Sequence, residues 1–310
     1  MARTETTRDR TDALRVDHYP TRVSDTPQLL ERSEPTTRGG VDDGPLDQAA
    51  LDAFEQNGYL VLPEVFSADE IAGFRGRLDE LAADPAVRAD ERTITELESD
   101  QVRSIFEVHA SDALFGRLSA DPRVADVARQ LLGSEVYIHQ SRVNVKPGFV
   151  GKGFWWHSDF ETWHAEDGMP RMRCLSASVT LTDNYPHNGP LMVVPGSHRT
   201  FVTTVGATPE DHYKASLKKQ EVGTPDHDSL HELIVGQGRE IRQLTGRAGS
   251  VVFFDCNLMH ASSENQTPYP RSNVFLVYNS VDNGVEEPFA APSRRPQFVA
   301  ATTWQPVPRG

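Results

Sequence analysis

The stretch EVYIHQSRVNVK, residues 135–146, decides the fold class. It is rich in β-branched and aromatic residues, which predicts a strand and marks a change from the helical texture that precedes it. On a strand, Gln140, Arg142, Asn144 and Lys146 share one face. A polar strand face usually meets solvent, but beside a metal it would instead line the interior of a barrel that binds charged small molecules.

Further strands and helices flank this stretch. The downstream segments CLSASVTLT, GPLMVVP, GSVVFFD and SNVFLVYN are apolar or alternate, and Gly, Pro and Asn separate them. Upstream, helical spacing marks residues 46–54, 67–81 and 121–133, with Ser67 and Asp121 as N-caps. Helices followed by mostly antiparallel strands predict a mainly β fold with flanking helices, either a helix-buttressed β-barrel or a jelly roll.

The chain divides unevenly along its length. Residues 1–45 are polar, which predicts an arm that is poorly ordered or wraps the surface. We expect one domain over residues 46–300, with its β core at about 134–280 and an extended tail at 301–310. Residues 206–246 form a long polar insertion between strands, and a lid over a pocket is one interpretation of it.

Composition narrows the function classes. The 310 residues carry a formal net charge of -14, which argues against nucleic acid or an anionic membrane surface as a partner. The start, MARTETTRDR, has no apolar core of a secretory signal, and no apolar run approaches the length of a membrane span. Two widely spaced cysteines, Cys174 and Cys256, indicate reduced thiols, so we expect a cytoplasmic protein.

FWWHSDF, residues 154–160, contains the only H-x-D of the chain. If this segment is a strand, His157 and Asp159 point to the same side, as two ligands of a 2-His-1-carboxylate site would. Alternatively, Asp159 caps a turn and His157 is a structural histidine. The pair His164 and Glu166 has the same spacing but lies beside Asp167-Gly168, which predicts a loop and no metal role.

A later strand supplies the remaining candidates. His260 follows the apolar run GSVVFFD, and Arg271 lies eleven residues beyond it, on the next expected strand. A lone histidine after a strand is usually structural. Together with H-x-D, however, His260 completes a facial triad for Fe(II), and Arg271 is placed to bind the distal carboxylate of 2-oxoglutarate. Because Asp159 is a carboxylate rather than Gly or Ala, hydroxylation is favoured over halogenation.

The aromatic residues bear on the substrate. Most of those near residues 154–163 and 253–275 belong to the core by default. A subset around a polar pocket would suit a small cationic ring with a carboxylate fixed elsewhere.

Longer motifs resemble one family. The stretches that resemble ectoine hydroxylases are GFWWHSDFETWHAEDGMPRMRCLS and LTDNYPHNGPLMVVPGSH, and also HQSRVNVKPGF, FFDCNLMHASSEN, PYPRSNVFLVYNS and APSRRPQFVA. These are a branch of the phytanoyl-CoA-dioxygenase-like Fe(II)/2-oxoglutarate oxygenases, and the resemblance spans roughly residues 46–300. It implies a double-stranded β-helix (cupin-like jelly roll), a homodimer, and conversion of ectoine, 2-oxoglutarate and O₂ to 5-hydroxyectoine, succinate and CO₂.

The resemblance also implies roles for individual residues. Fe(II) is expected on His157, Asp159 and His260. The residues expected to bind 2-oxoglutarate are Lys146, Arg271, Asn144 and Ser176. The residues expected to contact the substrate are Gln140, Trp163, Phe254, Asn273, Phe275 and Phe106.

Three other functions stay open from the sequence. The same chemistry could act on another small zwitterion, which only the resemblance argues against. A non-catalytic cupin-like binding protein would not need an open metal site with Arg271 beside it. A zinc hydrolase on the same ligands would lack a general base and would differ in its metal content.

Overall fold

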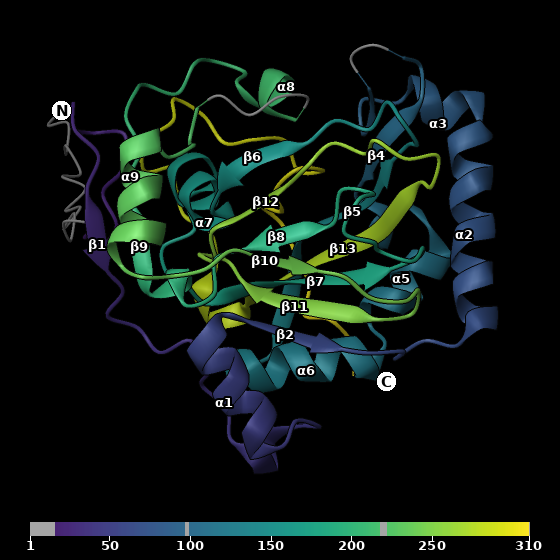
Figure 1. Ribbon diagram of the computed structural model, residues 1–310, viewed down its shortest axis with the longest axis horizontal. Coiled ribbons are helices and arrows are strands. Elements are labelled where there is room, and N and C mark those ends of the chain that lie inside the picture. The colour runs from purple at the N-terminus through teal and green to yellow at the C-terminus, as the bar shows by residue number, and fades with distance from the viewer. Residues whose placement is uncertain (1–15, 97–98, 218–221, 310) are drawn as a thin grey trace, which may run out of the picture.

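The computed structural model describes residues 16–96, 99–217 and 222–309 (Figure 1). Its helices are α1 (Gln48–Asn57), α2 (Ala68–Ala83), α3 (Pro85–Ala89), α4 (Val108–Ser111), α5 (Ala113–Ser119), α6 (Pro122–Leu132), α7 (Asp159–Thr162), α8 (Tyr213–Ser216) and α9 (His227–His231). Ser67 is the N-cap of α2, as predicted, and it forms a capping box: Ser67 Oγ accepts from Glu70 N, and the Glu70 side chain accepts from Ser67 N. Helix α6 begins after its predicted N-cap Asp121 and ends at Leu132, with Gly133 (φ 58°) as its C-cap.

Two antiparallel sheets form the predicted jelly roll. The larger follows the order β2 (Tyr59–Leu62), β11 (Val251–Asp255), β7 (Cys174–Thr180), β13 (Arg271–Ser280), β5 (Val136–Lys146), β4 (Val102–Phe106) and β3 (Thr93–Thr95). The smaller follows the order β10 (Arg242–Leu244), β8 (Leu191–Val193), β12 (His260–Ser262) and β6 (Phe154–His157). Because successive side chains of a strand point to opposite sides, each strand of the larger sheet has some side chains on an outer face and the others on an inner face.

The outer face of the larger sheet builds the main hydrophobic core. Leu175, Ala177 and Val179 of β7 pack there with Val274 and other residues of β13, β5 and β11. Helix α6 lies against β5, β7 and β13, below the sheet in Figure 1. Each fully buried Leu or Phe of such a core contributes about 1.5–3 kcal/mol to folding. The alternation predicted for β7 is thus confirmed.

The inner face of the same sheet is polar. Asn273 of β13 donates to Ser178 Oγ of β7 (2.9 Å), and both side chains are buried. On β5, Gln140, Arg142 and Asn144 line a pocket rather than meeting open solvent. Of the two interpretations of this strand face, the barrel interior is the correct one.

The residues before α1 lie along the barrel. Strand β1 (Leu29–Glu31) pairs antiparallel with β9 (Thr200–Val202), at the left of Figure 1. Arg32 forms a buried ion pair with Asp255 (2.8 Å). The first fifteen residues of the expected arm lie outside the described part of the chain, and the division at residues 45 and 300 stays a prediction.

The insertion 206–246 contains ordered elements in its described part. Helices α8 and α9 lie there, and a π-helical turn, Glu232–Gly236, follows α9. Strand β10, at the end of the insertion, pairs with β8, so the insertion contributes an edge to the smaller sheet.

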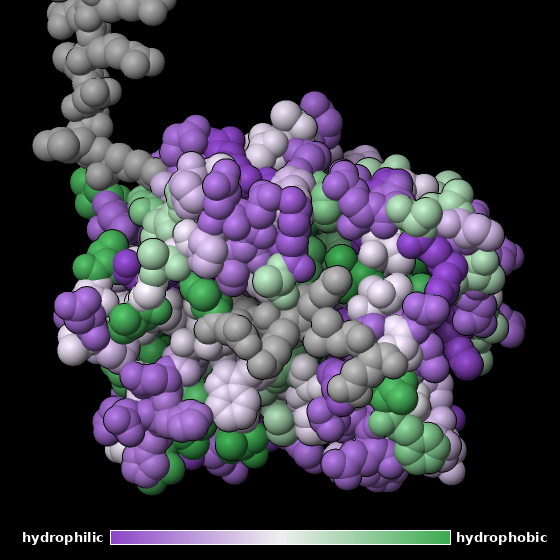
Figure 2. All heavy atoms as spheres, turned by 90° about the horizontal axis from the view of Figure 1, so that it is seen from above, coloured by the Kyte–Doolittle hydropathy of each residue, from purple (hydrophilic) through white to green (hydrophobic). Residues whose placement is uncertain are grey.

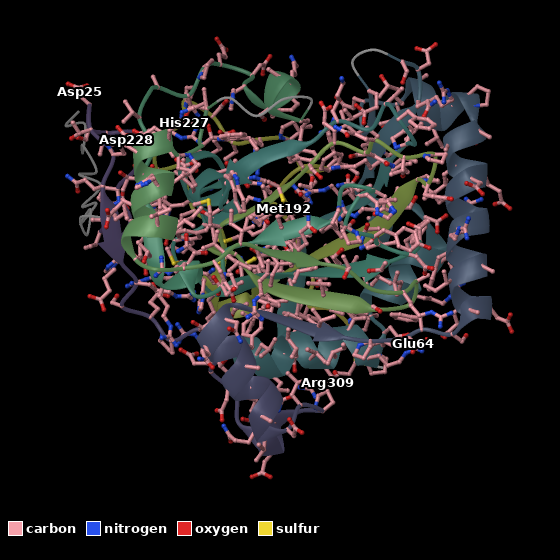
Figure 3. The ribbon with its side chains drawn as sticks, viewed as in Figure 1. Asp25, Glu64, Met192, His227, Asp228 and Arg309 are labelled. Atoms are coloured by element: carbon pink, nitrogen blue, oxygen red, sulfur yellow. The ribbon has the colours of Figure 1, made fainter. Side chains whose placement is uncertain are left out.

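The surface mixes hydrophilic and hydrophobic residues. Figure 2 shows hydrophilic and hydrophobic residues in small alternating patches over the described part of one face. In Figure 3, Asp25, Glu64 and Arg309 lie at the periphery, while Met192 of β8 lies over the centre of the barrel. Among the described residues, no helix combines the length and the apolar character that crossing a membrane requires.

Candidate active site

One pocket opens into the barrel between the two sheets. Strands of both sheets line it, together with α7, the π-helical turn that follows α7, and residues of α8 and its surroundings. Of the thirteen residues singled out from the sequence, twelve line this pocket: Phe106, Gln140, Asn144, Lys146, His157, Asp159, Trp163, Phe254, His260, Arg271, Asn273 and Phe275. Ser176 lies beside it, with its Oγ 3.5 Å from Asp159 Oδ2.

The three candidate metal ligands come together. His157 ends β6 and His260 begins β12, and the two are register partners with ring centroids 4.2 Å apart. Asp159 Oδ1 lies 3.7 Å from His157 Nε2 and 3.9 Å from His260 Nε2. Their ligand atoms all lie within 4.8 Å of one another, which suits a single ion.

Backbone carbonyls orient both imidazoles. His157 Nδ1 lies 2.7 Å from Trp155 O, and His260 Nδ1 lies 2.9 Å from Leu258 O. Because a carbonyl only accepts, each Nδ1 carries a proton and each Nε2 presents its lone pair toward Asp159. Burial, reinforced by His260, lowers the pKa of His157 to about 4, so this imidazole is neutral, as a ligand must be. Two imidazole nitrogens and one carboxylate fit Fe(II) of the facial-triad type.

The strand expected through Asp159 is wrong. Strand β6 ends at His157, Ser158 caps the next element by accepting from Glu161 N, and Asp159 is the first residue of α7. The carboxylate reaches the histidines because a strand end and a helix start meet there. The loop expected at residues 164–168 is also wrong, since the buried π-helical turn Trp163–Asp167 spans most of it.

The pair His164 and Glu166 stays away from this cluster. His164 contacts Met169 O through Nδ1 (2.8 Å) and Asp17 through Nε2 (3.0 Å). Glu166 pairs with Arg22 at 2.8 Å. Both side chains are thus occupied by structural contacts.

One end of the pocket is cationic. Lys146 Nζ donates to Ser262 Oγ (2.9 Å) and to Ser263 O (2.5 Å). Arg271 donates through Nη1 to Gly189 O (2.8 Å), while its buried Nε has no partner among the described residues. An unpartnered guanidinium nitrogen beside a lysine is what a carboxylate ligand would satisfy. Asn144, nearby on β5, accepts from Ser104 Oγ (2.5 Å).

The rest of the pocket is aromatic with a few polar groups. Phe254 and Phe275 meet edge to face at 6.5 Å, and Phe254 lies 5.1 Å from the His260 ring. Trp163 is 3% exposed, so it forms part of a buried wall. Gln140 Nε2 donates to Val299 O (2.5 Å), which fixes its amide at the pocket edge.

Arg142 and Arg295 are among the pocket-lining residues that were not site candidates. Arg142 is on the polar face of β5 and lies over the rings of Phe275 (5.0 Å) and Phe106 (5.8 Å). Burial lowers its pKa, and in the described part of the chain it has no ion-pair partner. Arg295 binds Asp167 through two hydrogen bonds (2.7 and 2.6 Å). The even spacing from Gln140 to Lys146 contained the signal for Arg142, but no spacing rule links residue 295 to the barrel.

Comparison with known proteins agrees with this geometry. The family model of phytanoyl-CoA dioxygenase (PhyH) matches residues 54–273. An ectoine dioxygenase of Stutzerimonas stutzeri (strain A1501) is 55% identical over 93% of this chain and 95% of that protein. One from Sphingopyxis alaskensis is 54% identical over 92% of both.

Solved structures agree as well. The crystal structure of EctD from S. alaskensis with 2-oxoglutarate and 5-hydroxyectoine has a TM-score of 0.83 and 49% identity, covering 92% of this chain and 94% of that chain. The same protein with bound Fe gives 0.83 and 48%, covering 95% and 99%. The carbocyclase SnoK, 23% identical with a TM-score of 0.59 over 84% and 90%, shares the fold. The chain therefore belongs to the phytanoyl-CoA dioxygenase (PhyH) family and, within it, to the ectoine dioxygenases.

Proposed function

We propose that this chain is an Fe(II)/2-oxoglutarate-dependent ectoine hydroxylase, which converts ectoine, 2-oxoglutarate and O₂ to 5-hydroxyectoine, succinate and CO₂. The observation that carries the proposal is one pocket that joins the cluster His157, Asp159 and His260 to the cationic pair Lys146 and Arg271, in a chain 55% identical to an ectoine dioxygenase. Three metal-ligating side chains alone would fit many enzymes. The cluster with a carboxylate site beside it favours a 2-oxo acid as cosubstrate.

The iron would be held by His157 Nε2, His260 Nε2 and an oxygen of Asp159. When bound, Fe(II) supplies the reactivity toward O₂, which no side chain of the pocket offers. The protein's part is to keep both histidines neutral and oriented, which the carbonyls of Trp155 and Leu258 do. Ser176, 3.5 Å from Asp159, would steady the carboxylate rather than bind 2-oxoglutarate directly.

The cosubstrate would lie along β5 and β13. Arg271 would bind its distal carboxylate through the Nε that lacks a partner, and Lys146 would add a second positive charge. Asn144 would complete the polar wall. Such contacts position the cosubstrate relative to the three metal ligands, and positioning is worth several orders of magnitude in rate.

The substrate would occupy the aromatic end. Ectoine carries a positively charged amidinium ring and a carboxylate. Trp163, Phe254 and Phe275 offer ring faces to the cation and exclude water from the reacting carbon. Gln140 and Asn273 offer amide groups to the ring. Arg142 is the cation best suited to the substrate carboxylate, because Lys146 and Arg271 would be occupied by 2-oxoglutarate.

Other features of this assignment are inferred from the family and the composition. We infer a homodimer and a cytoplasmic location, the latter supported by two buried free cysteines, Cys174 and Cys256. We also infer one dioxygenase domain over residues 46–300. Light scattering of purified protein tests the dimer, because a mass near 34.4 kDa would contradict it.

A coupled turnover assay tests the function. Anaerobically purified protein receives Fe(II), 2-oxoglutarate and ectoine, then O₂, and succinate and 5-hydroxyectoine are quantified together. We expect one succinate per hydroxyectoine and no turnover without iron. Succinate without hydroxyectoine would point to another small zwitterion as substrate, and neither product from iron-loaded protein would favour a binding protein.

A further inference from the structure

Arg22, far from the pocket residues in sequence, is the centre of a buried network on the far side of α7. Its backbone adopts φ 60°, a conformation that a residue with a side chain reaches only at a cost. Its side chain has no exposed area. A strained backbone and a buried guanidinium occur together only where many surrounding contacts offset their cost in free energy.

The first group of contacts joins Arg22 to the helix that carries Asp159. Arg22 binds Glu161 with both ends of its fork, Nε to Oε1 at 3.0 Å and Nη2 to Oε2 at 2.7 Å. Thr21 Oγ1 (2.9 Å) and Thr204 Oγ1 (2.6 Å) also donate to Glu161 Oε1. This carboxylate therefore accepts four hydrogen bonds, which fixes its position far more firmly than one ion pair would.

Glu161 and the pocket residues of the same helical segment face different ways. Asp159, Thr162 and Trp163 line the pocket, whereas Glu161 does not. On a helix, residues three and four apart share a face, whereas a residue two positions further on, as Glu161 is from Asp159, lies on another face. The segment therefore presents one face to the metal ligands and another to Arg22. A shift of Glu161 would thus move Asp159 and Trp163 as well.

The second group of contacts joins Arg22 to the insertion. Its Nη1 donates to Glu166 Oε1 (2.8 Å) and to Thr208 Oγ1 (2.7 Å). His212, which lines the pocket, lies 3.1 Å from the same Glu166 oxygen through its Nδ1. Burial opposes ionisation of Glu166, but His212, Arg295 and Arg22 outweigh it and lower its pKa to about 2. One guanidinium thus connects the helix behind the metal cluster to the insertion beside the pocket.

Gly223, near the middle of the insertion, also approaches Arg22. Its φ is 78°, and a Cβ there would lie 2.5 Å from Arg22 Nη2 and 2.6 Å from Glu161 Oε2. Only glycine lets the backbone approach the ion pair this closely. The close approach shows that the insertion is built around Arg22 at two points.

We propose that Arg22 is a positioning residue for the reaction: it binds the segment Asp159–Asp167 and the insertion into one unit, so that Trp163, Asp159 and His212 hold their places around the substrate. The proposal rests on the proposed function for the identity of that substrate. It assigns the residues before α1 a part in catalysis rather than only in stability. Lys146 and Arg271 lie on strands outside this network, so the 2-oxoglutarate site is independent of it.

The test compares Arg22→Lys with Arg32→Lys. Both substitutions keep a buried positive charge and lose the guanidinium fork. Arg32, however, binds Asp255 and Met172 O, and among the described residues it forms no hydrogen bond with α7. In Fe(II)-loaded protein we expect Arg22→Lys to raise KM for ectoine about tenfold, with KM for 2-oxoglutarate within about twofold of wild type. Arg32→Lys should lower thermal stability to a similar degree and leave both KM values near wild type. Equal effects of the two variants on KM for ectoine would overturn the proposal.

Amide hydrogen exchange measures the coupling between the two segments without relying on enzyme activity. Arg22→Lys should speed amide exchange in residues 159–167 and 206–217 together, while Arg32→Lys should not. Unchanged exchange in either segment would refute the coupling. If wild type fails to hydroxylate ectoine, the proposed function fails, whereas the exchange result still decides the network.

A second variant covers the case in which Arg22→Lys does not fold. Thr208→Val removes only the hydroxyl that accepts from Arg22 and donates to Ala290 O (2.6 Å). It should speed exchange in residues 206–217, leave 159–167 protected, and raise KM for ectoine less than Arg22→Lys would. Wild-type exchange in 206–217 would contradict the link to the insertion.

Discussion

Arg271 and Lys146 face each other as register partners on the antiparallel strands β13 and β5. Like charges directly opposite destabilise a sheet, and these two are also buried. Burial, reinforced by Arg271, lowers the pKa of Lys146 to about 6, and burial lowers that of Arg271 to about 10. The fold therefore makes the charged form of Lys146 unfavourable in the free protein, and a bound dicarboxylate would stabilise that form beside Arg271.

Binding of 2-oxoglutarate should take up a proton. In free protein above pH 6 Lys146 is largely neutral, and a neighbouring dianion favours its charged form and so raises its pKa. Up to one proton is then absorbed at pH 7.5, and affinity falls as pH rises above about 6. Calorimetry of anoxic protein in buffers of different ionisation enthalpy measures the uptake. Lys146→Met should abolish it, and an uptake that persists in this variant would assign the proton to another group.

Removal of the carboxylate ligand should abolish metal binding. Asp159→Ala leaves two imidazoles, too few to hold Fe(II) firmly in the cluster. We expect the iron content of reconstituted protein to fall from one per chain to near zero. His164→Ala is the matched control, because His164 lies five residues along the same segment and contacts Met169 and Asp17 instead. Iron loss in the control alone would reverse the assignment.

Substitutions at the two ends of the pocket should separate the two KM values. Trp163→Leu removes an aromatic wall and should raise KM for ectoine about tenfold, with KM for 2-oxoglutarate similar to wild type. Arg271→Ala should do the reverse, since a charge-assisted hydrogen bond is worth about 1.5–3 kcal/mol. Initial rates with each substrate varied in turn measure both constants. Parallel changes in the two variants would mean that the ends are not separate sites.

Arg142→Gln should weaken ectoine binding without loss of iron. This change removes the charge over Phe106 and Phe275 but keeps a polar side chain of similar length. KM for ectoine should rise about tenfold or more, because the substrate carboxylate loses its partner. An ectoine analogue without the carboxylate should bind wild type and variant alike. A variant that still prefers ectoine over this analogue would show that another residue binds the carboxylate.

The capping box of α2 should affect stability alone. Ser67→Ala removes the acceptor for Glu70 N and should lower the free energy of unfolding by about 1 kcal/mol. No residue of α2 lines the pocket, so kcat should stay at the wild-type value. Denaturant titration and turnover of the same preparation test both parts. A large loss of activity would indicate that α2 influences the pocket through the sheet.

The sequence by itself determined several helices and strands and the type of metal site. Residue spacing and caps located α2, α6, β5 and β7, because local propensity and burial agree there. The apolar alternation of β7 identified which face meets the core. H-x-D followed by a distant His and Arg indicated the metal type, since few other patterns combine these residue types in this order.

The tertiary structure alone decided how these residues meet. Asp159 reaches the histidines from a helix rather than a strand, because Ser158 caps α7 at the point where β6 ends. Arg142 lies in the pocket because the smaller sheet covers its face of β5. The alternation of side chains along a strand separates the two faces but does not tell which of them another sheet will cover. Arg22 and Glu161 are 139 residues apart, and only chain folding brings a guanidinium behind the helix that carries Asp159. Local interactions select secondary structure within a few residues, whereas buried charges find their partners only when distant segments pack together.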